Sequence, residues 1–260
     1  MSPGHRHAFT VSASLLFATV ALAQVQHEVD RLPVFGVDLA TDGQAVLIYD
    51  RESDPVVHVR QGDSWIEQGR LVQPTADDHY GMDIEGDLAA TCSRQQLPDS
   101  VLVSWVTVYR RAADGGWSLS SESQEPCDDV ALADGRLYVG RTGTGIEGGI
   151  GIHVETGDGS WSLETTLVAP DPDHAFFGAR LVVEGDRLVA TAIRWDDHSV
   201  LHVFVREDGV WRPEGELVPD DLPPWSLDRP DDWLTSIALD GSLVAVGDRS
   251  DPLSCTCFIL

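Results

Sequence analysis

The sequence contains no lysine, and its basic residues are few. All 17 basic side chains are arginines, and they stand against 43 aspartates and glutamates, so the formal net charge is −26. Nucleic acid and anionic lipid are both bound through basic surfaces, and a surface this acidic repels them. We therefore expect no nucleic acid partner.

Long apolar segments are also missing, except at the N-terminus. There Arg6 precedes an apolar run from Ala8 to Leu22, and Ala21-Leu22-Ala23 fits the small-x-small pattern of a cleavage site. The run is shorter than the roughly 20 residues that span a bilayer, which favours a signal peptide over a membrane anchor. The sequence predicts a signal peptide over residues 1–23 and a secreted mature chain over 24–260, periplasmic or extracellular and without membrane insertion.

Several enzyme signatures are absent as well. The chain has no G-x-S-x-G elbow, no H-E-x-x-H motif and no phosphate-binding loop. A sialidase would carry S-x-D-x-G-x-T-W boxes, and no segment has that spacing. These absences argue against the common hydrolase families. Glycoside hydrolysis by two carboxylates stays open, because acidic residues abound and their pairing needs coordinates.

The four cysteines are Cys92, Cys127, Cys255 and Cys257, and no C-x-x-C pair suggests a zinc site. An even number in an exported protein permits disulfides. Cys255 and Cys257 would share one face of a strand, where regular geometry keeps them from bonding to each other. Four cysteines allow three pairings, of which Cys92 with Cys127 is the one expected first.

An internal repeat is the main positive signal. Tryptophans follow Gly/Asp turns at separations of 52, 44 and 50 residues, at Trp65, Trp117, Trp161 and Trp211. Two-residue turns favoured in tight hairpins recur with a similar period, at Asp42-Gly43, Gly86-Asp87, Asp134-Gly135, Gly185-Asp186 and Asp240-Gly241. The turn tryptophans recur at one position of the repeat, as packing residues do.

Each period is typical of four short strands. In the fourth repeat we expect strands over 178–184, 187–193, 201–206 and 211–218, bounded by Gly, Asp and Pro. Repeated units of four strands predict an all-β fold, a β-propeller of about five blades. The expected repeats cover residues 34–74, 75–126, 127–170, 171–219 and 220–260. A β-sandwich is the rival, but it does not require self-similarity.

The fifth repeat lacks its fourth strand. The mature N-terminus has a spare one at Val25 to Leu32, which we expect to pair beside Cys255 to Leu260 and close the ring. Closure would remove exposed sheet edges. The alternative is a truncated copy whose last blade has an open edge and which has no independent function.

The order of these signals resembles the FG-GAP repeat family, the repeat of integrin-α-type propellers and of many exported bacterial proteins. The resemblance rests on Phe35-Gly36 and Phe177-Gly178, each followed by an apolar strand and a tight turn. It is imperfect in the third repeat, where Cys127-Asp128-Asp129 replaces aromatic-Gly. The family implies a non-enzymatic role in extracellular binding or adhesion. Many members hold calcium in D-x-D-x-D-G loops, but only two-residue turns occur here, so we expect no cofactor and no calcium at that position.

Acidic clusters and arginines are the candidate site residues. Three clusters end in histidine, and their oxygens are weak candidates for a metal site: Asp77, Asp78, Asp171, Asp173, Asp196 and Asp197. The alternative is a solvated acidic face. One arginine follows the second strand of every repeat, and a closed ring would bring the five together: Arg51, Arg94, Arg141, Arg194 and Arg249.

The arginines allow two interpretations. Each could pair with neighbouring aspartates, or together, with Trp195 as a stacking surface, they could bind an anionic ligand. The sequence as a whole predicts a non-enzymatic binding or adhesion protein that recognises an extracellular protein or glycan through its acidic loop face. The alternatives are an extracellular glycoside hydrolase or lyase on a propeller scaffold, or a truncated copy without function.

Overall fold

The fold was analysed in a computed structural model that describes residues 38–50, 53–62, 64–73, 78–97, 102–142, 148–194, 199–218, 234–248 and 255–259. These residues form nineteen β-strands, and within them no helix is long and apolar enough to cross a membrane. The expected signal peptide and the expected closing strand at Val25 to Leu32 lie outside these ranges, so both remain predictions.

The strands form five antiparallel sheets, four of them with four described strands and one with three. The first sheet contains β1 (Asp38–Thr41), β2 (Ala45–Tyr49), β3 (Val56–Gln61) and β4 (Ser64–Arg70). The second contains β5 (Asp78–Glu85), β6 (Leu88–Gln96), β7 (Leu102–Arg111) and β8 (Trp117–Gln124). The third contains β9 (Asp129–Ala133), β10 (Arg136–Arg141), β11 (Gly149–Glu155) and β12 (Trp161–Val168). The fourth contains β13 (Leu181–Glu184), β14 (Arg187–Ile193), β15 (Ser199–Glu207) and β16 (Val210–Leu217). The fifth contains β17 (Leu234–Asp240), β18 (Leu243–Asp248) and β19 (Cys255–Ile259).

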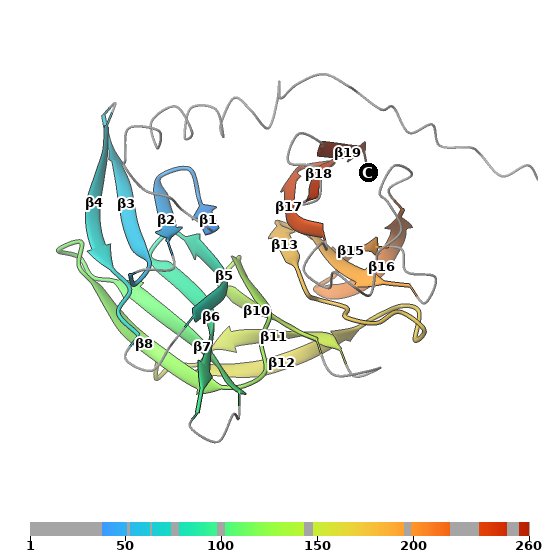
Figure 1. The fold of residues 1–260 in the computed structure, drawn as a ribbon, viewed down its shortest axis with the longest axis horizontal. Helices are drawn as coiled ribbons and strands as arrows, with labels where there is room; N and C mark the ends of the chain where they lie inside the picture. The colour runs from blue at the N-terminus through green and yellow to red at the C-terminus, as the bar shows by residue number, and fades with distance from the viewer. Residues whose placement is uncertain are drawn as a thin grey trace, which may run out of the picture.

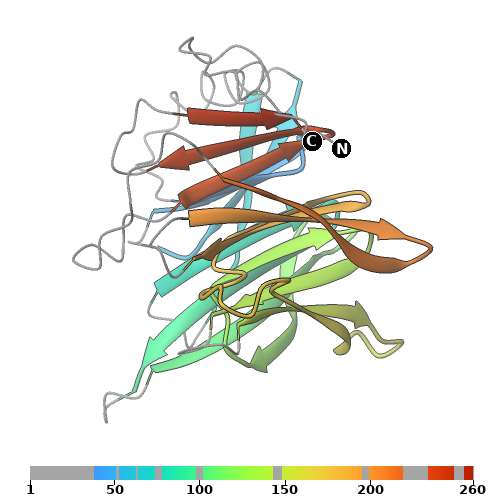
Figure 2. The same ribbon diagram turned by 90° about the vertical axis from the view of Figure 1, so that its right-hand side faces the viewer.

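The sheets are the blades of a β-propeller, which confirms the fold class expected from the sequence. In every blade, strands that follow one another in the chain are also hydrogen-bonded neighbours. The first strands β1, β5, β9, β13 and β17 contact one another in that order, so the blades follow each other around a common centre (Figure 1). Figure 2 shows the fifth sheet, in red, beside the fourth, in orange.

Most of the core lies between the faces of neighbouring blades. Tyr109 of the second blade, for example, is 1% exposed and packs with Leu47 and Val57 of the first blade. Three of the turn tryptophans pack at the edges of these clusters. Trp117 lies against the cluster of the first and second blades, Trp161 against that of the second and third, and Trp211 against that of the third and fourth. Burying apolar faces against the next blade is what holds a propeller together, at about 25 cal/mol per Å² of apolar surface.

The aromatic-glycine pair of the fourth repeat has a structural explanation. Phe177 is 1% exposed and packs in the interface with the third blade. Gly178 has a φ of +90°, and a Cβ there would lie 3.1 Å from the Ile150 side chain and 3.2 Å from the Gly149 carbonyl. Glycine is therefore required both by the left-handed backbone and by the close approach of the blades.

Acidic side chains connect the first hairpin of one blade to that of the next. The Asp42 carboxylate accepts a hydrogen bond from the Gly86 amide (2.9 Å), and Glu85 accepts one from the Asp134 amide (3.0 Å). Glu184 accepts one from the Gly241 amide (2.6 Å). Asp42, Glu85 and Glu184 sit at the ends of their hairpin strands, so part of the acidic composition serves to fix one blade against the next.

Candidate functional site

A departure from the repeat marks the most distinctive site. Three blades carry leucine six residues after the turn tryptophan, in the fourth strand or directly after it: Leu71, Leu167 and Leu217. Leu71 is fully buried and Leu167 is half-buried against the next core cluster. The second blade has Ser123 at this position, opposite Val106 of β7. Because serine is smaller than leucine, the interface between the second and third blades is left partly unfilled.

A pocket of about 140 Å³ occupies that place. Its walls come from β7 and β8 of the second blade and from β10, β11 and β12 of the third: Val106, Val108, Ser121, Ser123, Glu125, Leu137, His153, Trp161 and Leu163. Val106 and Leu137, each 2% exposed, give the pocket an apolar floor. The polar groups gather around Glu125.

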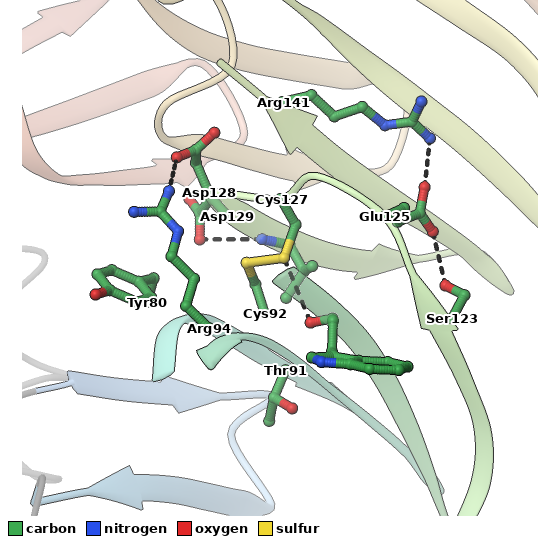
Figure 3. Close-up of a disulfide and its surroundings, with 12 residues drawn as sticks. Tyr80, Thr91, Cys92, Arg94, Ser123, Glu125, Cys127, Asp128, Asp129 and Arg141 are labelled. Carbon is green, nitrogen blue, oxygen red and sulfur yellow. Dashed lines mark hydrogen bonds and ion pairs between the residues drawn. A yellow bond between two sulfur atoms is a disulfide. The ribbon is translucent and has the colours of Figure 1, made fainter. Parts of the chain in front are cut away.

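Glu125 is the centre of a small polar network (Figure 3). Its Oε1 accepts a hydrogen bond from the Ser123 hydroxyl at 2.8 Å. Its Oε2 accepts one from Nη2 of Arg141 at 2.5 Å and lies 3.7 Å from Nε2 of His153. The carboxylate therefore meets a hydroxyl, a guanidinium and an imidazole beside one pocket.

Arg141 was one of the arginines expected to bind an anion, and a glycine makes room for it. A Cβ at position 151 would lie 2.7 Å from Arg141 Nη2, so any larger residue there would displace the end of the guanidinium. The Arg141 Nε–H is buried and has no hydrogen-bond partner in the described part of the chain, and the same holds for the Trp161 Nε1–H of the pocket wall. A buried N–H donor without a partner costs about 1–3 kcal/mol, so an acceptor that reached either group would stabilise it.

His153 is held in its neutral form. Burial lowers the pKa of its imidazole, and although Glu125 raises it, Arg141 lowers it further. A neutral imidazole can accept a proton at pH 7. The ladder between β11 and β12 shifts its register between Ile152 and His153.

A disulfide fixes the connection that carries Glu125. Cys92 of β6 and Cys127 form the pairing expected first from the sequence, and both residues are buried. Figure 3 places this disulfide between the Arg94 and Arg141 networks. A cross-link over 35 residues stabilises by about 3–4 kcal/mol in the chain-entropy account. It also holds the segment after β8 against the second blade, two residues from Glu125.

The other described arginines of the predicted set also meet carboxylates. Arg94 bonds to Asp128 and stacks over the Tyr80 ring at 4.3 Å from its centroid. Arg194 Nη1 lies 3.9 Å from Glu216 Oε1. Arg51, Arg249 and Trp195 lie outside the described residues, so the ring of five remains a prediction.

The arginine at the centre of the propeller is one that sequence reasoning missed. Arg180, just before β13, donates to the carbonyls of Tyr80 (3.2 Å) and Asp128 (3.3 Å). Burial raises the pKa of Asp129 to about 7, although Arg180 acts to lower it. Asp129 accepts the Leu181 amide at 2.9 Å. These groups connect the inner strands of three blades to one another.

The predicted metal candidates are only partly described. Asp77, Asp196 and Asp197 lie outside the described residues, as does the side chain of Asp78. Asp173 is exposed and its amide bonds to Asp171. Asp171 is the one that lies near a histidine, with Oδ2 3.6 Å from His174 Nε2.

No family model matches this chain, and no curated protein matches it. The FG-GAP resemblance therefore remains a prediction. Among solved structures, a candidate 6-phosphogluconolactonase from Bacteroides fragilis is similar at 13% identity with a TM-score of 0.46. The match covers 83% of this chain but only 63% of the Bacteroides protein. The periplasmic gluconolactonase of Pseudomonas aeruginosa is similar at 12% identity and a TM-score of 0.46, over 82% of this chain and 81% of that one.

The functional expectation from the sequence needs correction. We expected a non-enzymatic binding or adhesion protein, but both similar structures carry the names of enzymes. Blade packing determines the repeat, whereas function depends on the residues that depart from it.

Proposed function

We propose that this protein is a hydrolase that cleaves a small ester or lactone in the pocket between the second and third blades. The observation that carries the proposal is that the Glu125 carboxylate and neutral His153 both line the pocket, with the guanidinium of Arg141 bound to Glu125 behind this wall. The first two can move a proton, and the third can stabilise an oxyanion. Ester hydrolysis needs both functions.

The reaction assigns one role to each group. Glu125 takes a proton from a water molecule, and the water oxygen bonds to the carbonyl carbon of the substrate. The carbonyl π electrons move to the oxygen, and the Arg141 Nε–H donates to this oxyanion. When the tetrahedral intermediate collapses, the C–O bond to the leaving group breaks. The leaving alkoxide takes the proton held by Glu125, with His153 as the neighbouring group through which it can pass.

The pocket suits a small acyl group. Its volume of about 140 Å³ is more than the roughly 10–15 Å³ that one water molecule needs, so a small group fits. Leu163 of the wall is 52% exposed, and Ser123 is exposed as well, so the pocket opens to solvent. The rest of a larger substrate would stay outside.

The donor set favours ester chemistry over the glycoside hydrolysis weighed from the sequence. Glu125 is the one carboxylate among the described residues that line the pocket. Retaining and inverting glycosidases commonly use a pair of carboxyl groups about 5–9.5 Å apart. The pocket instead offers a carboxylate and an imidazole, and the carboxylate is bound by the guanidinium of Arg141.

The test is hydrolysis of a panel of small esters and of five- and six-membered lactones, including gluconolactone. The rate is measured as proton release, and the spontaneous rate is subtracted. Glu125→Gln removes the base, and we expect kcat/KM to fall at least 100-fold. Glu122→Gln is the matched control, because Glu122 is an exposed residue of β8, three positions before Glu125, and the rate of this variant should equal that of the wild type. Circular dichroism checks that both variants fold. The proposal fails if no compound is hydrolysed above the blank, or if both variants are equally active.

A further inference from the structure

A second side-chain cluster lies in the fourth blade, away from the pocket. His174 belongs to the connection between β12 and β13, while His202 and Glu216 face each other across β15 and β16. His174 Nδ1 lies 2.9 Å from His202 Nε2 and 4.0 Å from Glu216 Oε2. Three groups of the kind that ligate metals thus converge from three segments, with their ligand atoms all within 4.8 Å of one another.

The blade does not need this cluster for its own architecture. The cross-strand pair at the equivalent register is Val56 with Arg70 in the first blade, Thr107 with Glu122 in the second and Gly151 with Thr166 in the third. Histidine opposite glutamate therefore occurs in the fourth blade alone among the four described pairs. A buried imidazole at a position where the other three blades use valine, threonine and glycine calls for another explanation.

We propose that His174 Nδ1, His202 Nε2 and Glu216 bind a divalent transition-metal ion of the Zn²⁺ type. Zinc bonds to histidine nitrogen and carboxylate oxygen at about 2.0–2.2 Å, which places tetrahedral ligands about 3.4 Å apart. The 2.9 and 4.0 Å separations lie on either side of that value. Two imidazoles and one carboxylate are also a common three-ligand zinc set that leaves a fourth position open.

A second carboxylate orients the histidine. Asp171 Oδ2 lies 3.6 Å from Nε2 of His174, on the opposite side of the ring from the other two ligands. A carboxylate on the outer nitrogen keeps the proton there and leaves the lone pair of Nδ1 for a metal, which is the usual arrangement around metal-bound histidine. Asp171, one of the metal candidates expected from the sequence, is thus assigned a supporting position rather than a ligand position.

The burial of the three groups agrees with this assignment. His202 is 2% exposed, so its ring lies inside the blade. His174 is 9% exposed, whereas the Glu216 side chain is 33% exposed, which gives an ion a route from solvent.

The competing explanation is a hydrogen bond between two neutral imidazoles. In that case His202 Nε2–H donates to His174 Nδ1, and Glu216 serves Arg194, whose Nη1 lies 3.9 Å from Oε1. The two explanations differ in a measurable way. A metal ion would replace the proton between the two imidazoles and would also bind Glu216. A hydrogen bond between the imidazoles does not involve Glu216.

The experiment is calorimetric titration of the chelator-treated full chain with ZnCl₂ at pH 7.5 in 0.15 M NaCl. We expect one site of micromolar affinity or tighter, which His202→Ala weakens at least 100-fold and Glu216→Gln at least 10-fold. Asp173→Asn is the matched control, an exposed acidic residue of the same connection, and should bind like the wild type. Because Glu216 is partly exposed, Glu216→Gln tests the site even if His202→Ala does not fold.

A second readout identifies the ligands. Co²⁺ in the same site should give the visible absorption of a tetrahedral complex in the wild type and in Asp173→Asn, and not in His202→Ala. The proposal is overturned if zinc does not bind, because only the imidazole–imidazole hydrogen bond would then remain. It is also overturned if Glu216→Gln and the wild type bind equally, because Glu216 would then not be a ligand. Hydrolysis by the pocket of the second and third blades is a separate measurement, so the two proposals can fail independently.

Discussion

Replacing Ser123 with leucine separates the function of the pocket from the stability of the fold. The change restores the residue that the other three blades carry at this position, Leu71, Leu167 and Leu217. A fully buried leucine gains about 1.5–3 kcal/mol, but Leu167 and Leu217 are only half-buried, so we expect about half of that. Loss of the Ser123–Glu125 hydrogen bond costs about 0.5–1 kcal/mol.

The two contributions nearly cancel, so Ser123→Leu should change the free energy of unfolding by less than about 1 kcal/mol and Tm by less than about 4 °C. The side chain would nevertheless fill the pocket, and hydrolysis should fall at least 100-fold. The reverse exchange in the first blade, Leu71→Ser, empties a fully buried position and should cost about 2–5 kcal/mol.

Thermal unfolding followed by circular dichroism, with proton-release assays on the same samples, measures both effects. The reasoning is refuted if Ser123→Leu retains hydrolysis, because a filled pocket cannot hold the substrate. It is also refuted if the variant loses more than about 2 kcal/mol of stability, because the space inferred at this interface would then be absent.

Three further predictions concern the pocket, the disulfide and one buried carboxyl. Gly151→Ala should lower kcat/KM at least 10-fold, because the new Cβ would displace the end of Arg141, whose Nη2 lies 2.7 Å away. Tm should fall by less than about 4 °C, because the end of the arginine side chain can move. An unchanged rate would show that the position of the guanidinium does not affect hydrolysis. The double change of Cys92 and Cys127 to alanine should cost about 3–4 kcal/mol in denaturant unfolding, and a loss below about 1 kcal/mol would contradict the assigned role of the disulfide. Burial raises the pKa of the Asp83 carboxyl to about 7, above its value in the unfolded chain. The folded state therefore binds more protons than the unfolded state between about pH 4 and 7, and the free energy of unfolding should fall as the pH rises through this range. Asp83→Asn should make that decline shallower in urea titrations at several pH values, and an unchanged slope would rule out this carboxyl as its source.

The blades were predictable from the sequence because their signals are local. A two-residue turn and a period-2 alternation each involve fewer than ten residues, and they placed the strands of the fourth blade well: 187–193 was expected and β14 spans Arg187–Ile193. The first strand was expected from Gly178, but β13 begins at Leu181, because Gly178 has a positive φ and stands before the ladder. Turn chemistry and strand pairing are read from neighbours in the chain.

The candidate sites were harder to predict because their residues meet across blades. Arg141 was singled out from its shared position, but its partner Glu125 lies on the other blade and carries no motif. The signal that could have found the pocket was Ser123, six residues after Trp117 where other repeats have leucine. Similarly, His174 and His202 are 28 residues apart, and only the packing of the connection onto β15 brings them together.

The most direct test of the proposed hydrolase is a side-by-side measurement of kcat/KM for the wild type, Glu125→Gln and Ser123→Leu on the ester and lactone panel. The first variant removes the base, and the second fills the space and also removes the hydrogen bond from Ser123 to Glu125. The account predicts measurable hydrolysis by the wild type, at least a 100-fold loss in both variants, and native circular dichroism spectra in all three. Hydrolysis at equal rates in all three proteins, or in none, would contradict it.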